Sequence, residues 1–117
     1  MLIFAITSNK ITYPSSQQTG NVVSPLRLDK RQIRRELRTV KSWMLRGKRI
    51  SRLFVFDDFM QCIRFLNRVA RFAEDMYHHP DVSINYNKIR LSLTTHDEGG
   101  LTRKDFRLAR RINRLMK

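Results

Sequence analysis

Residues 82–94 alternate apolar and polar side chains in two short runs separated by a tight turn. Side chains at every second position of a strand lie on the same face of a sheet. The alternation therefore predicts a hairpin of two antiparallel strands, with one face on a core and one polar face. Helices over the apolar face would complete a layered α+β arrangement. The apolar positions are Val82, Ile84, Tyr86, Ile89, Leu91 and Leu93.

A second pair of strands is predicted upstream, over residues 42–45 and 49–56. The residues between them, 46–48, are typical of a turn. Because the connection is short, we expect the two strands to pair antiparallel. The stretch 53–56 is apolar on both faces, so part of this strand is expected to be covered on both sides.

Three segments carry apolar residues at spacings of three and four, which predicts amphipathic helices. The first begins at Asp29, the second after Asp57 or Asp58, and the third after Thr102, all residues that cap helices well. Pro80 ends the second helix. The order α-β-β-α-β-β-α predicts an α+β fold, a four-stranded antiparallel sheet with three helices on one face.

The domain is placed at residues 27–117, and residues 1–26 are expected to be an N-terminal extension. This segment contains no acidic residue and is rich in Ser, Thr, Asn and Gln. Three alternatives stay open for it: a disordered or loosely attached tail, an additional ordered segment, or an organelle-targeting peptide. The pattern of a secretory signal is missing, and so are the roughly 18 consecutive apolar residues of a membrane span. We therefore expect a cytoplasmic protein with no membrane span.

Composition removes several classes of function. Cys62 is the single cysteine among 117 residues, which excludes an intrachain disulfide framework and a multi-cysteine zinc or iron–sulfur site. A lone cysteine suits a reducing compartment. The four glycines form neither a glycine-rich phosphate loop nor a GxSxG elbow. Most nucleotide-binding and serine-hydrolase functions are thereby disfavoured.

The net charge of +14 is distributed unevenly along the chain. Residues 27–52 hold 11 Lys/Arg and two acids, and residues 103–117 hold seven Lys/Arg and one acid. Residues 53–102 hold five basic and seven acidic residues, together with all three histidines. The basic flanks are either solvated helix faces or a surface for nucleic acid, an acidic partner or a membrane surface. The centre is expected to have a different role.

His78 and His79 fall at the end of the second predicted helix, and His96 falls at the end of the last strand. A helix end and a strand end can meet at one edge of such a layer. Imidazoles, which titrate near pH ~6.5, would make a proton-transfer site there. Each of these residues also has a purely structural interpretation. The helix dipole favours His78 and His79 at a helix end, His96 can simply be solvated, and Asp105 can serve only as a helix cap together with Thr102.

Two further alternatives concern neighbouring residues. Tyr86 is either part of a site or a plain hairpin aromatic. Three histidines and a water could also bind zinc. Adjacent histidines usually diverge, however, and no fourth ligand is apparent, so we expect no metal.

The central region resembles pterin-4a-carbinolamine dehydratase. The family pattern has a charged residue, three further residues, His-His-Pro, an aromatic, a later His and then an Asp. The resemblance is specific over residues 54–115 and weaker back to Asp29, and Trp43 stands where the family commonly has a tryptophan. The matching segments are Glu74-Asp75-Met76-Tyr77-His78-His79-Pro80, Tyr86-Asn87-Lys88, Thr94-Thr95-His96-Asp97, Gly100-Leu101 and Asp105.

The resemblance implies the α-β-β-α-β-β-α fold and a hydro-lyase activity. The reaction removes water from 4a-hydroxytetrahydropterin to give quinonoid dihydropterin, by histidine general acid/base catalysis, in recycling the pterin of aromatic amino acid hydroxylases. It also implies no metal, no other cofactor and a homo-oligomer, either dimer or tetramer. The implied catalytic residues are His78, His79, His96 and Asp105, and the implied substrate-binding residues are Glu74, Pro80, Tyr86, Thr95 and Asp97.

A second function remains open. Some relatives act as partner proteins, including a transcriptional coactivator and assembly proteins. The alternative is therefore a non-enzymatic binding module on the same fold, whose basic helices contact nucleic acid or an acidic protein. Retention of the whole histidine pattern favours the enzyme.

Overall fold

The computed structural model describes residues 2–4 and 26–116 of the chain. Helices and strands alternate much as the sequence predicts. The elements are β1 (Leu2–Phe4), α1 (Lys30–Leu37), β2 (Met44–Arg46), β3 (Arg49–Val55), α2 (Phe59–Met76), β4 (Asp81–Asn85), β5 (Lys88–Leu93), the short 3-10 helix η2 (His96–Glu98) and α3 (Arg103–Arg114).

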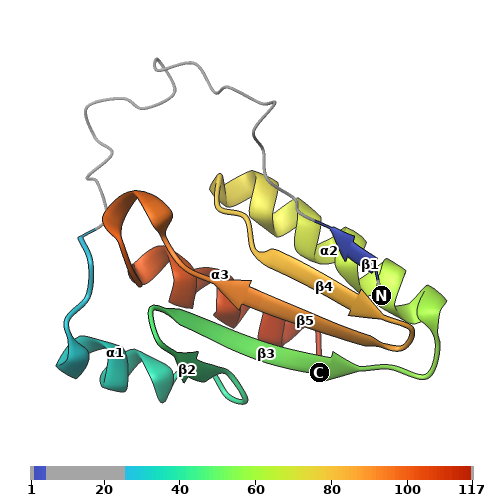
Figure 1. Cartoon of the computed structure of the whole chain (residues 1–117), viewed down its shortest axis with the longest axis horizontal. Coiled ribbons are helices and arrows are strands. Elements are labelled where there is room, and N and C mark those ends of the chain that lie inside the picture. Colours follow the sequence, from blue (N-terminus) through green and yellow to red (C-terminus); the bar gives the residue numbers. More distant parts are fainter. Residues whose placement is uncertain (1, 5–25, 117) are drawn as a thin grey trace.

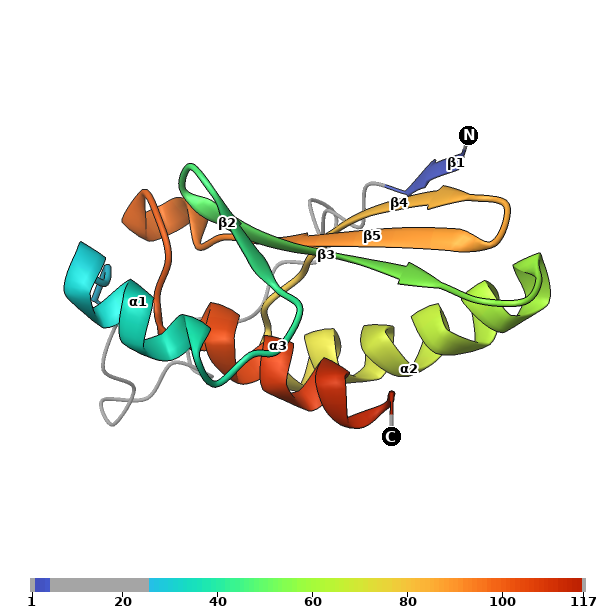
Figure 2. The ribbon, with the colours of Figure 1, turned by 90° about the horizontal axis from the view of Figure 1, so that it is seen from below.

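The strands form one antiparallel sheet in the order β1-β4-β5-β3-β2 (Figure 1). The three α-helices lie on the same face of this sheet (Figure 2). The predicted α+β fold, with its four antiparallel strands and three helices, is confirmed. β1 adds an edge strand beside β4, from within the predicted extension 1–26. The remainder of that extension, 5–25, lies outside the described residues, so the domain division stays a prediction.

The core lies between the sheet and the helices. The predicted alternation of β4 and β5 holds, because Val82, Ile84, Ile89, Leu91 and Leu93 are all buried. From the helical layer, α2 and α3 close over these strands. Their fully or almost fully buried side chains include Cys62, Phe65, Val69, Phe106, Leu108 and Ile112.

α2 is the longest helix, and its two ends are set by local chemistry. At its start, the Asp58 carboxylate accepts a hydrogen bond from the Gln61 amide at 2.8 Å. Burial, with a smaller contribution from Asp58, raises the pKa of the Cys62 thiol, which therefore stays protonated at neutral pH. Among residues 2–4 and 26–116, no helix is both long enough and apolar enough to cross a bilayer.

Three local expectations differ from the structure. β2 begins at Met44 because Ser42 has a positive φ of 73° and lies in a turn. Tyr86 lies in the β4–β5 turn with φ 53° and is 65% exposed, so the alternation ends one residue earlier. On the outer face of β3, Leu53 and Val55 are 43% and 57% exposed, so the described residues do not cover that strand on both sides.

Candidate active site

The end of α2 delivers two adjacent histidines to one end of the sheet. The helix ends at Tyr77, which adopts the left-handed conformation with φ 50°. The amide of His78 then donates to the carbonyl oxygen of Ala73 at 3.0 Å, a common way to close a helix. The chain turns toward β4, and His78 becomes buried, with 8% exposure.

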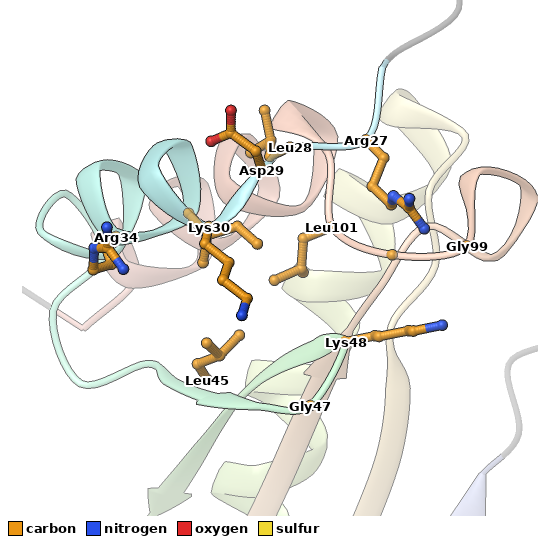
Figure 3. A pocket seen from close by; sticks show the side chains of 12 residues that line it. Arg27, Leu28, Asp29, Lys30, Arg34, Leu45, Gly47, Lys48, Gly99 and Leu101 are labelled. Carbon is orange, nitrogen blue, oxygen red and sulfur yellow. The ribbon is translucent and has the colours of Figure 1, made fainter.

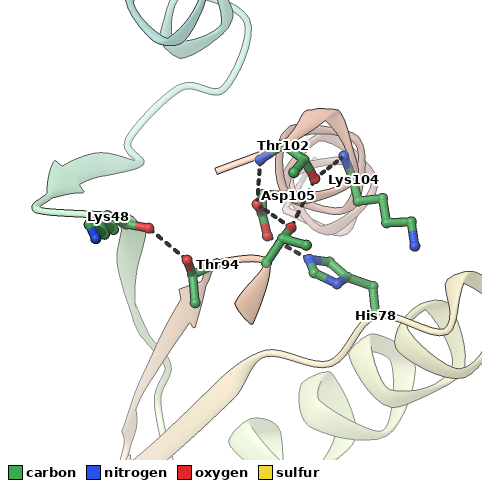
Figure 4. Close-up of polar contacts among 7 residues, drawn as sticks. Lys48, His78, Thr94, Thr102, Lys104 and Asp105 are labelled. Carbon is green, nitrogen blue, oxygen red and sulfur yellow. Dashed lines mark hydrogen bonds and ion pairs between the residues drawn. The ribbon is translucent and has the colours of Figure 1, made fainter. Parts of the chain in front are cut away.

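Asp105, in the first turn of α3, is completely buried and forms the centre of a polar cluster (Figure 4). Its Oδ1 lies 2.5 Å from Nε2 of His78. Its Oδ2 accepts hydrogen bonds from the Thr95 hydroxyl at 2.8 Å and from the Thr102 amide at 2.9 Å. The end of α2, the segment after β5 and the start of α3 thus meet at one carboxylate. We call these four residues, His78, Thr95, Thr102 and Asp105, the His78–Asp105 cluster.

The direction of each hydrogen bond in the cluster follows from the acceptor. An ionised carboxylate only accepts, so the Thr95 hydroxyl donates to Asp105. The hydroxyl of Thr102 lies 2.8 Å from the hydroxyl of Thr95. Because the Thr95 proton is used on Asp105, the Thr102 hydroxyl donates to the Thr95 oxygen. His78 donates from Nε2, which leaves Nδ1 as the ring nitrogen that can take up a proton. This contact places Asp105 where it can hold the imidazole in one orientation and favour the tautomer with its proton on Nε2.

His79 forms a second imidazole–carboxylate pair. Its Nε2 lies 2.5 Å from Oε2 of Glu74, in the last turns of α2. The side chain of His79 is 12% exposed and that of Glu74 is 52% exposed. The first acid of the sequence pattern and its second histidine are therefore in contact, at the edge of the site.

His96 lies on the exposed helix η2, beyond the cluster. Two backbone hydrogen bonds between Thr95 and Gly100, of 3.0 and 3.3 Å, hold the ends of this loop together. The His96 side chain lines a shallow cavity of about 240 Å³ together with Lys48 and Thr94. His96 thus follows the cluster directly in the chain and lines this neighbouring cavity.

The remaining predicted residues lie at different distances from the cluster. Pro80 is buried just before β4, and Asp97 is exposed on η2. Tyr86 lies in the turn at the far end of β4, so the described chain does not bring it to the histidines (Figure 1). The structure joins His78, Thr95 and Asp105, pairs His79 with Glu74, and places His96 beside them. Their roles in catalysis stay predictions.

One member of the cluster was predicted only as a helix cap. Thr102 and Asp105 do form the capping box that their spacing indicates. Asp105 uses Oδ2 for this cap and Oδ1 for His78. It can therefore cap α3 and contact His78 at the same time. The Thr102 hydroxyl also contacts Thr95, which sequence spacing does not reveal.

A family model described as pterin 4 alpha carbinolamine dehydratase matches residues 26–115. A protein of Sulfurisphaera tokodaii, provisionally named pterin-4-alpha-carbinolamine dehydratase, is 47% identical over 90 residues, which are 77% of this chain and 97% of that protein. A protein of Sulfolobus acidocaldarius with the same provisional name is 37% identical over 90 residues, which are 77% of this chain and 99% of that protein.

Two solved structures have a similar fold. A transcriptional coactivator/pterin dehydratase from Brucella melitensis is 33% identical, with a TM-score of 0.74 that covers 78% of this chain and 99% of the other. A pterin dehydratase-like protein, identified as a RuBisCO assembly factor in the alpha-carboxysome, is 22% identical and shares the fold, with a TM-score of 0.55 over 66% of this chain and 92% of the other. Because the family match spans β2 to β5, the three α-helices and the His78–Asp105 cluster, the chain belongs to the pterin 4 alpha carbinolamine dehydratase family.

Proposed function

We propose that this protein dehydrates 4a-hydroxytetrahydropterin to quinonoid dihydropterin. The observation that carries the proposal is the His78–Asp105 cluster, in which a buried carboxylate orients an imidazole. Burying polar groups of this kind costs desolvation free energy, so stability alone is a weak reason for the cluster. Family membership supplies the reaction class.

The reaction needs two proton movements. The hydroxyl group leaves C4a as water and must be protonated as the C4a–O bond breaks, while a ring nitrogen of the pterin must lose its proton. His78 suits the second step, because Asp105 holds its Nε2 proton and would stabilise the imidazolium formed when Nδ1 takes up a proton. His79 and His96, which lie nearer the surface, are the candidates for the acid. A positioned general acid or base typically raises the reaction rate about 10²–10⁴-fold.

The direct test is turnover. Purified protein is mixed with freshly generated 4a-hydroxytetrahydropterin, and formation of the quinonoid product is followed by rapid-mixing absorbance. We expect acceleration proportional to enzyme concentration above the spontaneous dehydration. A rate equal to the background for folded protein would contradict the proposal and favour a binding module.

We expect turnover to be independent of metal. Among the described residues, no group of three or more His, Cys, Asp or Glu side chains is arranged to hold a metal ion. Incubation with a chelator, followed by removal of the chelator, should therefore leave the rate unchanged. Loss of activity that zinc restores would overturn this prediction.

We also propose a homo-oligomer, either a dimer or a tetramer. The short edge strand β2 leaves its outer side unpaired by any described strand, and natural proteins commonly cover such edges. Met44, on β2, is 60% exposed, and Leu53 and Val55 add apolar surface on β3. Light scattering at micromolar concentration should give a mass of two or four chains, and a purely monomeric mass would count against the prediction.

The exposed basic face of α1 supports a second candidate, a binding module for nucleic acid or an acidic protein. Among the described residues, the three arginines of α1 and Arg38 directly after it make no ion pair, whereas two arginines of α3, Arg110 and Arg111, pair with Glu36 and Asp75. Unpaired exposed charge of one sign raises the local potential for a polyanion. The four arginines are Arg31, Arg34, Arg35 and Arg38.

Reversing these four arginines to glutamate separates the two functions. Exposed charges more than about 10 Å apart are largely screened at 0.1 M salt, so turnover of a pterin with an uncharged side chain should stay within a few-fold of wild type. Binding to a polyanion such as heparin should weaken and show a shallower salt dependence, since fewer counterions are released. The matched control replaces the same four residues with lysine, which keeps the charge.

Each assay can contradict one half of this prediction. If turnover collapses in a folded quadruple glutamate variant, the helix contributes to the active site or to an oligomer interface. If wild-type protein shows no salt-dependent binding to any polyanion, the basic face has no such role.

A further inference from the structure

A pocket of about 760 Å³ lies between the start of α1, the β2–β3 turn and the loop before α3 (Figure 3). We call it the α1–β2 pocket. Small-molecule sites commonly have volumes of ~300–1,000 Å³, so this pocket has the size of a ligand site. The backbone amide of Leu28 donates to the carbonyl oxygen of Leu101 at 2.8 Å, which fixes the chain before α1 against the start of α3. The pocket is therefore built by packed elements.

The interior of the pocket is apolar. Leu28 and Leu101 are buried at its base, and Ile33 lines it from α1. Leu45, on β2, faces the pocket and is 44% exposed, so apolar surface remains accessible to a ligand (Figure 3). A bound molecule with an apolar or planar body would cover this surface and gain hydrophobic free energy.

The rim of the pocket is cationic. Arg27, Lys30, Arg34 and Lys48 all line it, and all four are exposed. Within the described part of the chain, none of their side chains forms an ion pair or hydrogen bond. The one acid of the rim, Asp29, accepts a hydrogen bond from the Gln32 amide at 2.8 Å as the cap of α1. Four unpaired cations around an apolar base favour a ligand that carries negative charge.

Arg27 and Lys48 lie on the side of the pocket where Gly99 passes (Figure 3), and Gly100 lines the same pocket. A Cβ atom at Gly100 would lie 2.9 Å from Cδ of Arg27, so glycine here leaves room for the arginine stem. Lys48, Gly99 and Gly100 also line the cavity of His96. The α1–β2 pocket therefore adjoins the proposed catalytic residues through shared walls.

We infer that the α1–β2 pocket binds a small anionic amphiphile. The apolar or planar part of the ligand lies on Leu45 and Leu101, and its carboxylate or phosphate is held by Lys30, Lys48 and Arg27. This chemistry has two sources: a charged side chain on the pterin substrate, or a separate anionic molecule. The first source rests on the proposed function, whereas the pocket itself does not.

The probe for the pocket is anilinonaphthalene sulfonate, whose fluorescence rises in apolar surroundings. We expect saturable binding with one site per chain. The uncharged analogue N-phenylnaphthylamine should bind at least about tenfold more weakly, a difference that equals ~1.4 kcal/mol. Equal binding of the two probes, or no saturable binding, would overturn the inference.

Two charge-matched double variants locate the site. Lys30→Glu with Lys48→Glu reverses two cations of the rim, and Arg103→Glu with Arg107→Glu reverses two exposed cations on α3. The first should weaken sulfonate binding at least about tenfold, and the second by less than about threefold at 0.1 M salt. Equal loss of sulfonate binding in both double variants would show that the probe responds only to the overall positive charge. That result would overturn the inferred binding site. Gly100→Ala, which displaces Arg27, should weaken binding while leaving the probe's apolar contacts intact.

Turnover then distinguishes the two sources of the ligand. The assay compares 4a-hydroxytetrahydropterins whose side chains are either uncharged or carry carboxylates. If the pocket takes the substrate's side chain, the Lys30→Glu, Lys48→Glu variant raises KM more for the acidic substrate than for the uncharged one. If neither KM changes, the ligand is a separate anionic molecule. Failure of turnover in wild-type protein would refute the proposed function, and the sulfonate titration would still test the pocket.

Discussion

Replacing His78 with alanine is expected to lower turnover of 4a-hydroxytetrahydropterin at least about tenfold with the fold intact, as for a lost acid–base group. The loss should fall on kcat, because the Asp105-oriented imidazole is proposed to act on a proton rather than to hold the substrate. His96→Ala is likewise expected to lower turnover at least about tenfold. His79→Ala should affect KM more than kcat, given the position of His79 at the edge of the site.

Controls separate chemistry from folding in this series. Asn67→Ala, an exposed substitution in α2, should leave both kinetic constants near the wild-type values. Added imidazole should restore part of the His78→Ala rate, because it can occupy the vacated space and accept the proton. Full activity of both His78→Ala and His96→Ala, in protein whose circular dichroism is normal, would refute the assignment.

The fold could be predicted because each apolar pattern has a single period. Ile89, Leu91 and Leu93 alternate without interruption, and all three are fully buried. The alternation of apolar and polar residues does not show where a strand ends in a turn. Tyr86 continues the alternation, but its positive φ places it in the turn and exposes it. Apolar residues at 2–4 are compatible with several structures, so the sequence did not identify β1.

The candidate site could be predicted in part, because the spacing of His78, His79 and Asp105 resembles a family pattern. Spacing does not show which groups touch. That the Thr95 hydroxyl and the Thr102 amide share one oxygen of Asp105 depends on how the loop of η2 folds back through Gly100. The cationic α1–β2 pocket was not predicted either, since its walls come from three distant segments of the chain.

Substitutions of Asp105 can separate its contribution to stability from its proposed role in catalysis. Asp105→Ala removes a fully buried acceptor and leaves the donors of His78, Thr95 and Thr102 without it. A buried donor left unsatisfied costs about 1–3 kcal/mol, so with three donors affected we expect the free energy of unfolding to fall by at least about 3 kcal/mol. Thr102→Ala is the matched comparison in the same helix cap, and it should cost only about 1 kcal/mol. Chemical denaturation followed by circular dichroism measures both.

Asp105→Asn should behave differently from both of these variants. The amide keeps the size of the side chain, and its oxygen can still accept from the Thr102 amide, so most of the stability should remain. Its NH₂ group would face Nε2 of His78, however, and an amide donor there favours the tautomer with the proton on Nδ1. The proposed base then loses its lone pair at Nδ1, and kcat should fall about as far as in His78→Ala, at least about tenfold. A stable Asp105→Asn protein with wild-type kcat and an unchanged pH–rate profile would show that Asp105 only caps α3 and that His78 does not need it for catalysis.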